Sequence, residues 1–366
     1  MRVNDPGRYD FARCFSLIMK PTLVINFVGL DISKNWFNVY IIQKLAFRHI
    51  QFRCDNSPDG IVELGQRLKA SRVSLSKLTV VTMEHTGIYG KLLVHFFSNH
   101  RVNLCVEIGA RIKRSLGTAK GKDDLIDARR IAEYSKRHLD KLCFYTKKSK
   151  SLEIIKTLLK SRSRLLKAKG MIETPLKELQ SYSYEKDNRY FRSVNLAFTK
   201  ALKETSNRIT TEIEHIVESD AELKRQVSLL TSIPGIGFYT AVSLVCYTNR
   251  FTSCSTSGQL ASYCGCAPFS YSSGLKPGKS HTNKMSNRFL KGHLHLAALS
   301  LIRSHNEIKV YYDRKVAEGK PKNLIINNVG HKLLLRVMAV IKRGTKYVPI
   351  GTFRRQMDML QITGIS

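Results

Sequence analysis

The first third of the chain carries short apolar runs separated by segments with the apolar spacing of amphipathic helices. The run over residues 23–31 ends in an acid, and two β-rich segments follow it closely, as hairpin partners would. Ser57 and Pro58 supply an N-cap and a first-turn proline, so a helix is expected to begin there. The pattern predicts strands at 23–31, 36–42, 47–52, 78–83 and 102–106, and helices at 57–68, 89–98 and 124–138.

The predicted order of elements is β-β-β-α-β-α-β-α, with three meandering strands at the start. A simple doubly wound sheet would instead alternate strands and helices from its first element. The order therefore favours an α/β domain of the RNase H-like (RuvC-like) type at the N-terminus.

The middle of the chain, from about 147 to 230, has a helical apolar period, many charges and few strand signals. A helical hairpin or coiled coil fits this pattern, with a turn over residues 181–188. Its first helix is crowded with lysine and arginine, which has two interpretations of equal weight. It is either an arm for dimerisation and nucleic-acid binding or a solvated basic face on a helical linker.

The last third is predicted to be mainly helical, with helices at 285–304 and 324–341. Residues 233–237 (Ile-Pro-Gly-Ile-Gly) precede them and resemble a helix-hairpin-helix turn, whose following helix can meet a DNA phosphate with its N-terminal amides. An ordinary corner between two helices is the alternative. The expected organisation is an extension (1–22), an α/β domain (23–146), a helical coiled-coil linker (147–228) and a C-terminal domain (229–366).

The charge balance narrows the class of partner. The chain of 366 residues has 61 Lys and Arg against 28 Asp and Glu, a formal net charge of +33. Such a surplus repels itself unless a polyanion is bound, and nucleic acid gains affinity from every counterion that a neutralised phosphate releases. A nucleic-acid-binding protein without catalytic activity, of the ribosomal or chromatin type, would explain the positive charge equally well.

No apolar run approaches the roughly 18 residues of a membrane helix, and the charged N-terminus lacks the centre of a signal peptide. The eight cysteines include no CxxC pair, which argues against a zinc ribbon and favours thiols in a reducing compartment. We therefore expect no membrane partner and a cytoplasmic protein.

Four acids occupy positions that the predicted fold would bring together. Asp31 ends the first strand and Glu84 ends the fourth, and these two strands are neighbours in an RNase H-like sheet. Asp124 and Asp127 stand three residues apart, so both lie on one face of their helix. That face would meet the two strand ends, and Asp123 is the ambiguous neighbour of the pair.

Such a set suits metal-assisted phosphoryl transfer. Mg²⁺ takes hard oxygen ligands and binds through a few carboxylates plus substrate phosphate. Two such ions roughly 4 Å apart activate the attacking oxygen and stabilise the leaving one. For one acid alone, a helix cap or a solvated charge is the better interpretation. For four acids at these positions, in a chain poor in acids, the sequence favours a metal site.

Several segments together resemble one known family. Residues 29–34 (Gly-Leu-Asp-Ile-Ser-Lys), 84–87 (Glu-His-Thr-Gly) and 122–128 (Lys-x-Asp-x-x-Asp-Ala) are similar to motifs of the DEDD transposases of the insertion sequence 110 family. The glycine turn at 233–237, Ser273-Gly274 and the helix start at 284–291 resemble further motifs, in the family's order. Ser286 stands where the family usually has glycine.

The resemblance implies specific chemistry. It implies a transposase with Asp31, Glu84, Asp124 and Asp127 as Mg²⁺ ligands, Mn²⁺ being the alternative metal. It also implies that Ser273 is a nucleophile that forms a phosphoserine link to DNA, although Ser272 precedes it and only the Ser-Gly match separates the two. Donor and target DNA, a noncoding bridge RNA and a homodimer or tetramer would be the partners.

Two other functions remain open at the level of sequence. A RuvC-like nuclease or Holliday-junction resolvase would use the same four acids with water as the nucleophile. A nucleic-acid-binding protein without catalysis would need none of them, and the four-acid pattern argues against it because binding phosphate does not require acids.

Overall fold

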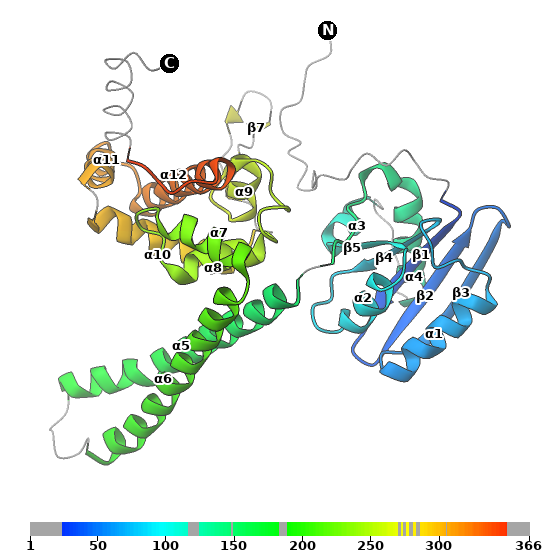
Figure 1. The fold of residues 1–366 in the computed structure, drawn as a ribbon, viewed down its shortest axis with the longest axis horizontal. Coiled ribbons are helices and arrows are strands. Elements are labelled where there is room, and N and C mark those ends of the chain that lie inside the picture. Colours follow the sequence, from blue (N-terminus) through cyan, green and yellow to red (C-terminus); the bar gives the residue numbers. More distant parts are fainter. Residues whose placement is uncertain are drawn as a thin grey trace, which may run out of the picture. The chain divides into compact units, whose positions relative to one another are not determined.

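The structure is a computed structural model that describes residues 24–115, 124–147, 149–182, 189–269, 272–273, 276–277, 281–282, 286–304 and 306–349. The chain forms two compact units, Met1–Lys147 and Lys148–Ser366. The first contains a mixed sheet with helices, and the described part of the second is mostly helical (Figure 1).

The N-terminal unit is built on a five-stranded sheet with the strand order β3-β2-β1-β4-β5. Strands β1, β2 and β3 form an antiparallel meander, while β1, β4 and β5 run parallel. The strands are β1 (Asn26–Ile32), β2 (Trp36–Gln43), β3 (Arg48–Asp55), β4 (Thr79–Glu84) and β5 (Asn103–Glu107). The helices are α1 (Pro58–Ala70), α2 (Lys91–Ser98), α3 (Gly109–Ser115) and α4 (Asp124–Arg137), followed by a 3-10 turn at Leu139–Lys141. This arrangement is compatible with the predicted RNase H-like fold.

Most of these elements agree with the apolar pattern. Ser57 caps α1 by accepting a hydrogen bond from the amide of Gly60 (3.1 Å), and Pro58 occupies the first turn, as predicted. The short helix α3, between β5 and α4, was not expected, because its seven residues hold less than two turns of apolar periodicity.

The two faces of the sheet carry different helices. Alternate residues of each strand point to opposite faces, so the buried side chains divide into two clusters. On one face, Val28, Leu30, Val81 and Met83 join Leu64 and Leu68 of α1 and Leu93 and Phe97 of α2. On the other, Phe27, Tyr40, Val80 and Cys105 join Ile112 of α3 and Ala128, Ile131, Ala132 and Tyr134 of α4. The second face is the one to which Asp31 and Glu84 belong.

Helix α4 lies directly on the backbone of β1 at Gly29. A Cβ at this position would overlap the carbonyl oxygen of Ala128 and approach the amide nitrogen of Ala132 to 2.5 Å. Both alanines are fully buried, so small residues line both sides of the contact. Only glycine permits this approach, and the contact fixes where α4 crosses the sheet.

The C-terminal unit begins with two long helices that lie side by side as an arm, α5 (Lys150–Tyr182) and α6 (Arg189–Glu218) (Figure 1). The beginning of α5 and the end of α6 pack into the core of the unit. The buried side chains there are Leu152, Ile155, Leu159, Ile213 and Val217. Farther out the arm leaves large apolar side chains in solvent, with Met171 77% and Leu196 69% exposed.

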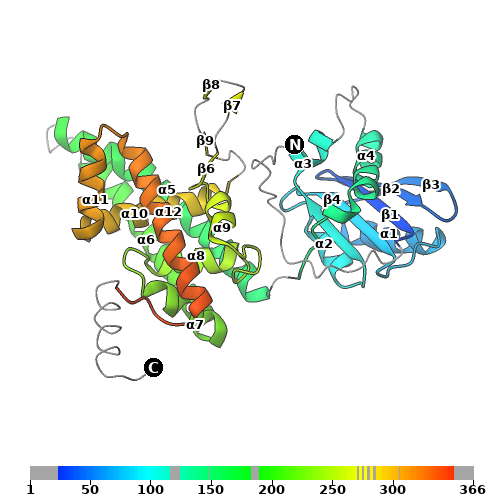
Figure 2. The ribbon, with the colours of Figure 1, turned by 90° about the horizontal axis from the view of Figure 1, so that it is seen from above.

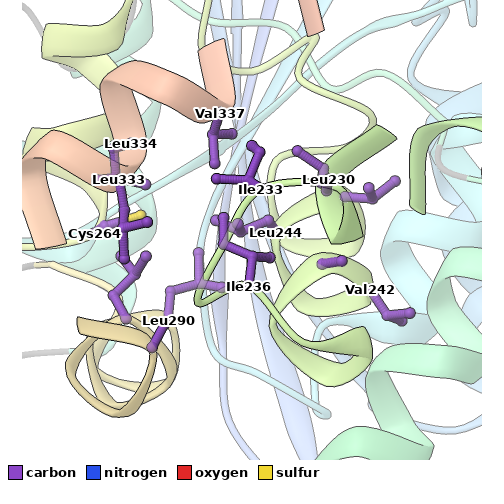
Figure 3. Packing of buried hydrophobic residues seen from close by; sticks show 14 of the residues in the cluster. Leu230, Ile233, Ile236, Val242, Leu244, Cys264, Leu290, Leu333, Leu334 and Val337 are labelled. Carbon is purple, nitrogen blue, oxygen red and sulfur yellow. The ribbon is translucent and has the colours of Figure 1, made fainter. Parts of the chain in front are cut away.

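The rest of this unit is a cluster of helices around one core. They are α7 (Ala221–Thr231), α8 (Phe238–Tyr247), α9 (Ser257–Tyr263), α10 (Arg288–Ser304), α11 (Asn306–Ala317) and α12 (Lys322–Arg343). Figure 3 shows side chains of several of them converging, with Leu290 of α10 facing Leu333 and Leu334 of α12. Helix α12 is long and apolar enough to cross a membrane by length and composition, but half of its most apolar window is buried in this core.

The glycine turn at 233–237 joins α7 to α8. Ile233 and Ile236 are buried in the core, and Gly235 has a φ of +85°. A Cβ on Gly235 would lie 3.0 Å from the carbonyl oxygen of Ala297 in α10, whereas one on Gly237 would meet open space. The turn therefore anchors the α7–α8 corner on α10 and leaves the start of α8 accessible.

Asn287 caps the N-terminus of α10. Its side-chain oxygen accepts from the amides of Phe289 (3.1 Å) and Leu290 (3.2 Å), which caps α10, and its nitrogen donates to the hydroxyl of Tyr263 (3.1 Å). Ser286 lies against Gly265, where a Cβ would come within 2.5 Å of the serine Oγ. Ser286 is thus accommodated by a glycine opposite it.

We predict that Gly29→Ala destabilises the N-terminal unit. The added methyl group must push α4 away from β1, and such overpacking costs about 1–3 kcal/mol or more. The control is Gly65→Ala in α1, where a Cβ would make only ordinary contact with Phe96 (3.7 Å) and alanine favours the helix by about 1 kcal/mol. Urea unfolding of both variants measures the difference, and equal stability would contradict the close contact.

Candidate active site

Asp31 and Glu84 lie at one edge of the sheet, on neighbouring parallel strands. In the ladder between β1 and β4, the last pair is formed by Leu30 and Met83. Asp31 directly follows Leu30, and Glu84 directly follows Met83. Both side chains belong to the face covered by α4, because Phe27 and Val80, four residues earlier in each strand, belong to that cluster. The structure thus brings these two predicted site residues together.

The carboxylate of Glu84 rests on the backbone at the start of α3. A Cβ on Gly109 would overlap Oε1 and Cδ of Glu84 and lie 2.8 Å from Oε2. The bare Cα of Gly109 therefore provides the space in which this carboxylate sits.

A third acid, Glu107, stands opposite Glu84 in the register of β4 and β5. It is only 5% exposed, and its charge is compensated. Oε2 accepts from Arg111 (3.1 Å) and from the hydroxyl of Tyr134 (3.2 Å), and Oε1 accepts from the amide of Ile108 (3.0 Å). Burial, and then the neighbouring Glu107 carboxylate, raise the pKa of Tyr134, so its hydroxyl remains a donor. Glu107 thus ties α3 and α4 to the end of β5.

The other two predicted acids are on α4. Asp124 is the first residue of the helix, and its side chain lies outside the described residues. Asp127 directly precedes Ala128, the residue that packs on Gly29. Its Oδ1 accepts from Arg130 (2.9 Å), and its side chain is 40% exposed. Asp127 is therefore accessible but shares its carboxylate with an arginine.

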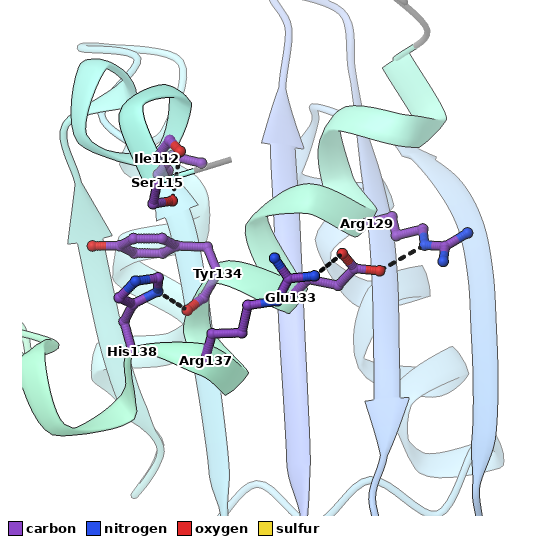
Figure 4. Close-up of polar contacts among 7 residues, drawn as sticks. All are labelled: Ile112, Ser115, Arg129, Glu133, Tyr134, Arg137 and His138. Carbon is purple, nitrogen blue, oxygen red and sulfur yellow. Dashed lines mark hydrogen bonds and ion pairs between the residues drawn. The ribbon is translucent and has the colours of Figure 1, made fainter. Parts of the chain in front are cut away.

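The outer face of α4 forms its own ion pairs. Glu133 accepts from Arg129 (2.8 Å) and from Arg137 (3.4 Å), as Figure 4 shows. Arg129 follows the predicted acids in sequence, but its guanidinium forms an ion pair with Glu133, one turn farther along the helix.

The donor set suits a hard cation, since carboxylate oxygens are the ligands that such ions prefer. Among the residues whose side chains are described, no group of three or more His, Cys, Asp or Glu is close enough to hold a metal ion. The described part of the site is therefore a pair, Asp31 and Glu84, with Asp127 on the helix that covers the same face.

Ser273 belongs to the other unit. The strands β6 (Pro268–Phe269) and β9 (His281–Thr282) form one antiparallel ladder, and β7 (Ser272–Ser273) and β8 (Lys276–Pro277) form a second. Figure 2 shows β7 and β8 beyond β6 and β9, farther from α9. Ser273 is paired with Lys276, so the predicted nucleophile is held by backbone pairing in a short hairpin, while its side chain lies outside the described residues.

Comparison with known proteins agrees with this architecture. A family model described as a DEDD transposase of IS110 type matches residues 28–178, and one described as the transposase IS116/IS110/IS902 family matches residues 227–313. The chain belongs to the IS110 family of transposases.

Three relatives of this transposase match it at 26–34% identity, over different shares of the chain. The pilin gene-inverting protein of Moraxella lacunata is 26% identical over 88% of this chain and 97% of its own length. An uncharacterised 43.6 kDa protein of the insertion element IS110 from Streptomyces coelicolor is 34% identical over 32% of the chain and 29% of its own length. The transposase for insertion sequence element IS1111A of Coxiella burnetii is 28% identical over 50% of the chain and 55% of its own length.

The chain is thus an enzyme of DNA transposition and recombination, and its DEDD class implies a divalent metal. Three residues that shape the candidate site were not identified from the sequence: Gly29, Glu107 and Gly109. Gly29 appeared in the sequence analysis only as part of the motif at residues 29–34, without a structural role. Glu107 carried the same signal as Asp31 and Glu84, an acid at the end of a strand.

We predict that Gly109→Ala impairs metal-supported DNA cleavage by the transposase without unfolding it. The new methyl group takes the space of the Glu84 carboxylate, whose far end can rotate away, so we expect a stability change below about 1 kcal/mol. Displacing a ligand's support typically costs about 10–100-fold in activity. Cleavage by Gly109→Ala and by the Gly65→Ala control is compared at fixed Mg²⁺, and equal rates would show that Glu84 does not depend on this space.

Proposed function

We propose that this transposase cuts and rejoins DNA with two cooperating groups: a metal site formed by Asp31, Glu84, Asp124 and Asp127, and the nucleophile Ser273. The observation that supports it most is the placement of Asp31 and Glu84 side by side on the face that α4 covers. Binding phosphate alone would not require carboxylates at this edge.

Mg²⁺ is the metal we propose, with Mn²⁺ as a substitute. Bound to these carboxylates, a divalent ion polarises a phosphodiester and stabilises the charge on the oxygens that attack and leave. Asp31 and Glu84 supply ligands from the rigid sheet, and Asp127 and Asp124 supply ligands from the first turn of α4. Binding by Asp127 requires that its carboxylate be shared between the ion and Arg130.

The covalent step conserves phosphodiester bonds. The Oγ of Ser273 forms a bond to phosphorus while the bond from phosphorus to a deoxyribose oxygen breaks. The serine proton leaves to a base or to solvent, and the leaving oxygen acquires one. The phosphoserine link is itself a phosphodiester, so the number of phosphodiester bonds does not change. A deoxyribose hydroxyl of another strand can then attack the phosphorus and release the serine, and no added energy source is needed.

The unit boundary at 147/148 supports a RuvC-like catalytic domain over 23–146, preceded by an extension. The arm and the helical cluster then form the coiled-coil linker (147–228) and the serine-bearing domain (229–366). The proposed partners are donor DNA, target DNA and a noncoding bridge RNA, which suit the net charge of +33. Exposed apolar side chains on the arm, such as Met171 and Leu196, support a homodimer or tetramer. The proposed location, the nucleoid of a bacterium or archaeon, follows from the family resemblance alone.

We predict a covalent protein–DNA adduct that depends on both units. The protein is incubated with Mg²⁺, DNA carrying the ends of the element and RNA transcribed from its noncoding region, and the products are separated on a denaturing gel. The adduct is expected with wild type and lost in Ser273→Ala and in Asp31→Ala. Ser272→Ala is the matched control and should retain it.

Each other outcome has a definite meaning. Cleavage without an adduct, unchanged in Ser273→Ala, indicates a hydrolytic nuclease or resolvase that uses water. An adduct lost in Ser272→Ala but not in Ser273→Ala moves the nucleophile by one residue. DNA binding that is indifferent to Asp31→Ala, with no cleavage, indicates a binding protein.

A further inference from the structure

Five polar residues form one row across the whole sheet, at the register of the candidate acids. Asp31 pairs with Asn38 of β2, and Asn38 pairs with Arg53 of β3. On the other side Glu84 follows the last β1–β4 pair, and it pairs with Glu107. Partners in register point to the same face, so all five side chains stand on the face that α4 covers. The row runs from a cation at one side of the sheet to the carboxylates at the other.

Asn38 is the buried member next to Asp31. It is 1% exposed, so its amide must be satisfied within the protein. Its Oδ1 accepts a hydrogen bond from Nε of Arg53 (3.0 Å). A guanidinium only donates, so the carbonyl end of the amide is the end that faces β3. The amide nitrogen is consequently turned the other way, toward β1 and Asp31.

Arg53 is itself held in place. Its guanidinium lies 5.2 Å from the centroid of the Trp36 ring, within the range of a cation–π contact. Trp36 and Asn38 are two residues apart on β2 and therefore share this face. The ring holds the arginine, and the arginine holds the amide in one orientation.

We propose that Asn38 is a positioning residue for Asp31, to which its amide nitrogen donates a hydrogen bond. One carboxylate oxygen of Asp31 is then fixed, and the other is directed to the carboxyl edge beside Glu84. The proposal rests on the metal-binding role proposed for Asp31. Arg53 acts indirectly, because its hydrogen bond to Asn38 fixes the orientation of the amide.

Removing Arg53 should change metal affinity in opposite directions, depending on whether Arg53 supports Asn38 or acts only through its charge. As a bare positive charge near a cation site, Arg53 would weaken metal binding, and its removal would strengthen it. As the support of Asn38, its removal frees the amide to rotate and weakens metal binding. Arg53 is exposed, so its replacement does not disturb the core.

The test measures Mn²⁺ binding to the full-length protein by titration calorimetry, with Mn²⁺ alone as the probe. Asn38→Ala should weaken Mn²⁺ affinity by about 10–100-fold, the usual effect of losing a group that orients a metal ligand. Arg53→Ala should weaken it by less, and should have no further effect in the Asn38→Ala background. Asp31→Ala should abolish the binding.

The matched control is Asn26→Ala at the opposite end of β1. Asn26 is also buried (3% exposed) and donates to a neighbouring strand, through Thr79 Oγ1 at 3.2 Å. Both asparagine variants should lower the melting temperature, and only Asn38→Ala should change Mn²⁺ affinity. Arg53→Ala, which keeps the core intact, gives the answer if Asn38→Ala does not fold.

Three results overturn the proposal. Unchanged affinity in Asn38→Ala, with loss in Asp31→Ala, leaves the metal site in place and makes Asn38 structural only. Stronger binding in Arg53→Ala identifies Arg53 as a charge and not as a support. Wild-type affinity in Asp31→Ala overturns the metal site of the proposed function together with this inference.

Discussion

The close contact between β1 and α4 determines the geometry of the N-terminal unit. At Gly29 the strand backbone meets the helix backbone at Ala128 and Ala132, where the largest side chain is the methyl group of an alanine. This contact sets the height of α4 above the sheet and the point at which it crosses β1. Asp127 immediately precedes the contact in the helix, and Asp31 follows it by two residues in the strand. The distance between strand acid and helix acid therefore depends on a glycine that carries no chemistry.

A helix held this closely must be compatible with the polar row beneath it. Each buried polar member of that row has its own partner, because an unsatisfied buried group is costly. Glu107 is neutralised by Arg111 and bonded by Tyr134, and Asn38 accepts from Arg53. These pairs lie on either side of Asp31 and Glu84. The pairs on both sides thus leave Asp31 and Glu84 as the neighbouring carboxylates at the edge of the sheet where we propose that a cation binds.

The sequence predicted what depends on local periodicity. The five strands of the N-terminal sheet, Ser57 as a cap and the long helices were recognised, because period-2 and period-3.6 patterns persist over several residues, whereas the two-residue strands β6–β9 were not. Asp31 and Glu84 were recognised because each acid ends an apolar run. The short helices α3, α9 (Ser257–Tyr263) and α11 (Asn306–Ala317) were missed, since seven to twelve residues in polar surroundings give a weak signal.

What could not be predicted depends on register and on close contacts between distant segments. Asn38 looks like an ordinary polar position in an amphipathic strand until its pairing with both Asp31 and Arg53 is known. Gly109 looks like a turn residue until the carboxylate of Glu84 is seen to occupy the space of its missing Cβ. Both relations depend on strand register and on contacts between separate elements, so no local sequence pattern contains them.

The proposed division of chemistry between a metal site in one unit and a serine nucleophile in the other would meet two different physical needs. Metal ligands must be fixed to a fraction of an ångström, and a buried sheet edge with a closely packed helix provides that rigidity. A nucleophile that carries a DNA strand must instead reach a phosphate and later release it to another strand. Ser273 stands in a two-residue ladder beyond the packed helices, joined to them through β6 and β9. A recombinase built this way can keep its charges in place while the DNA changes partners.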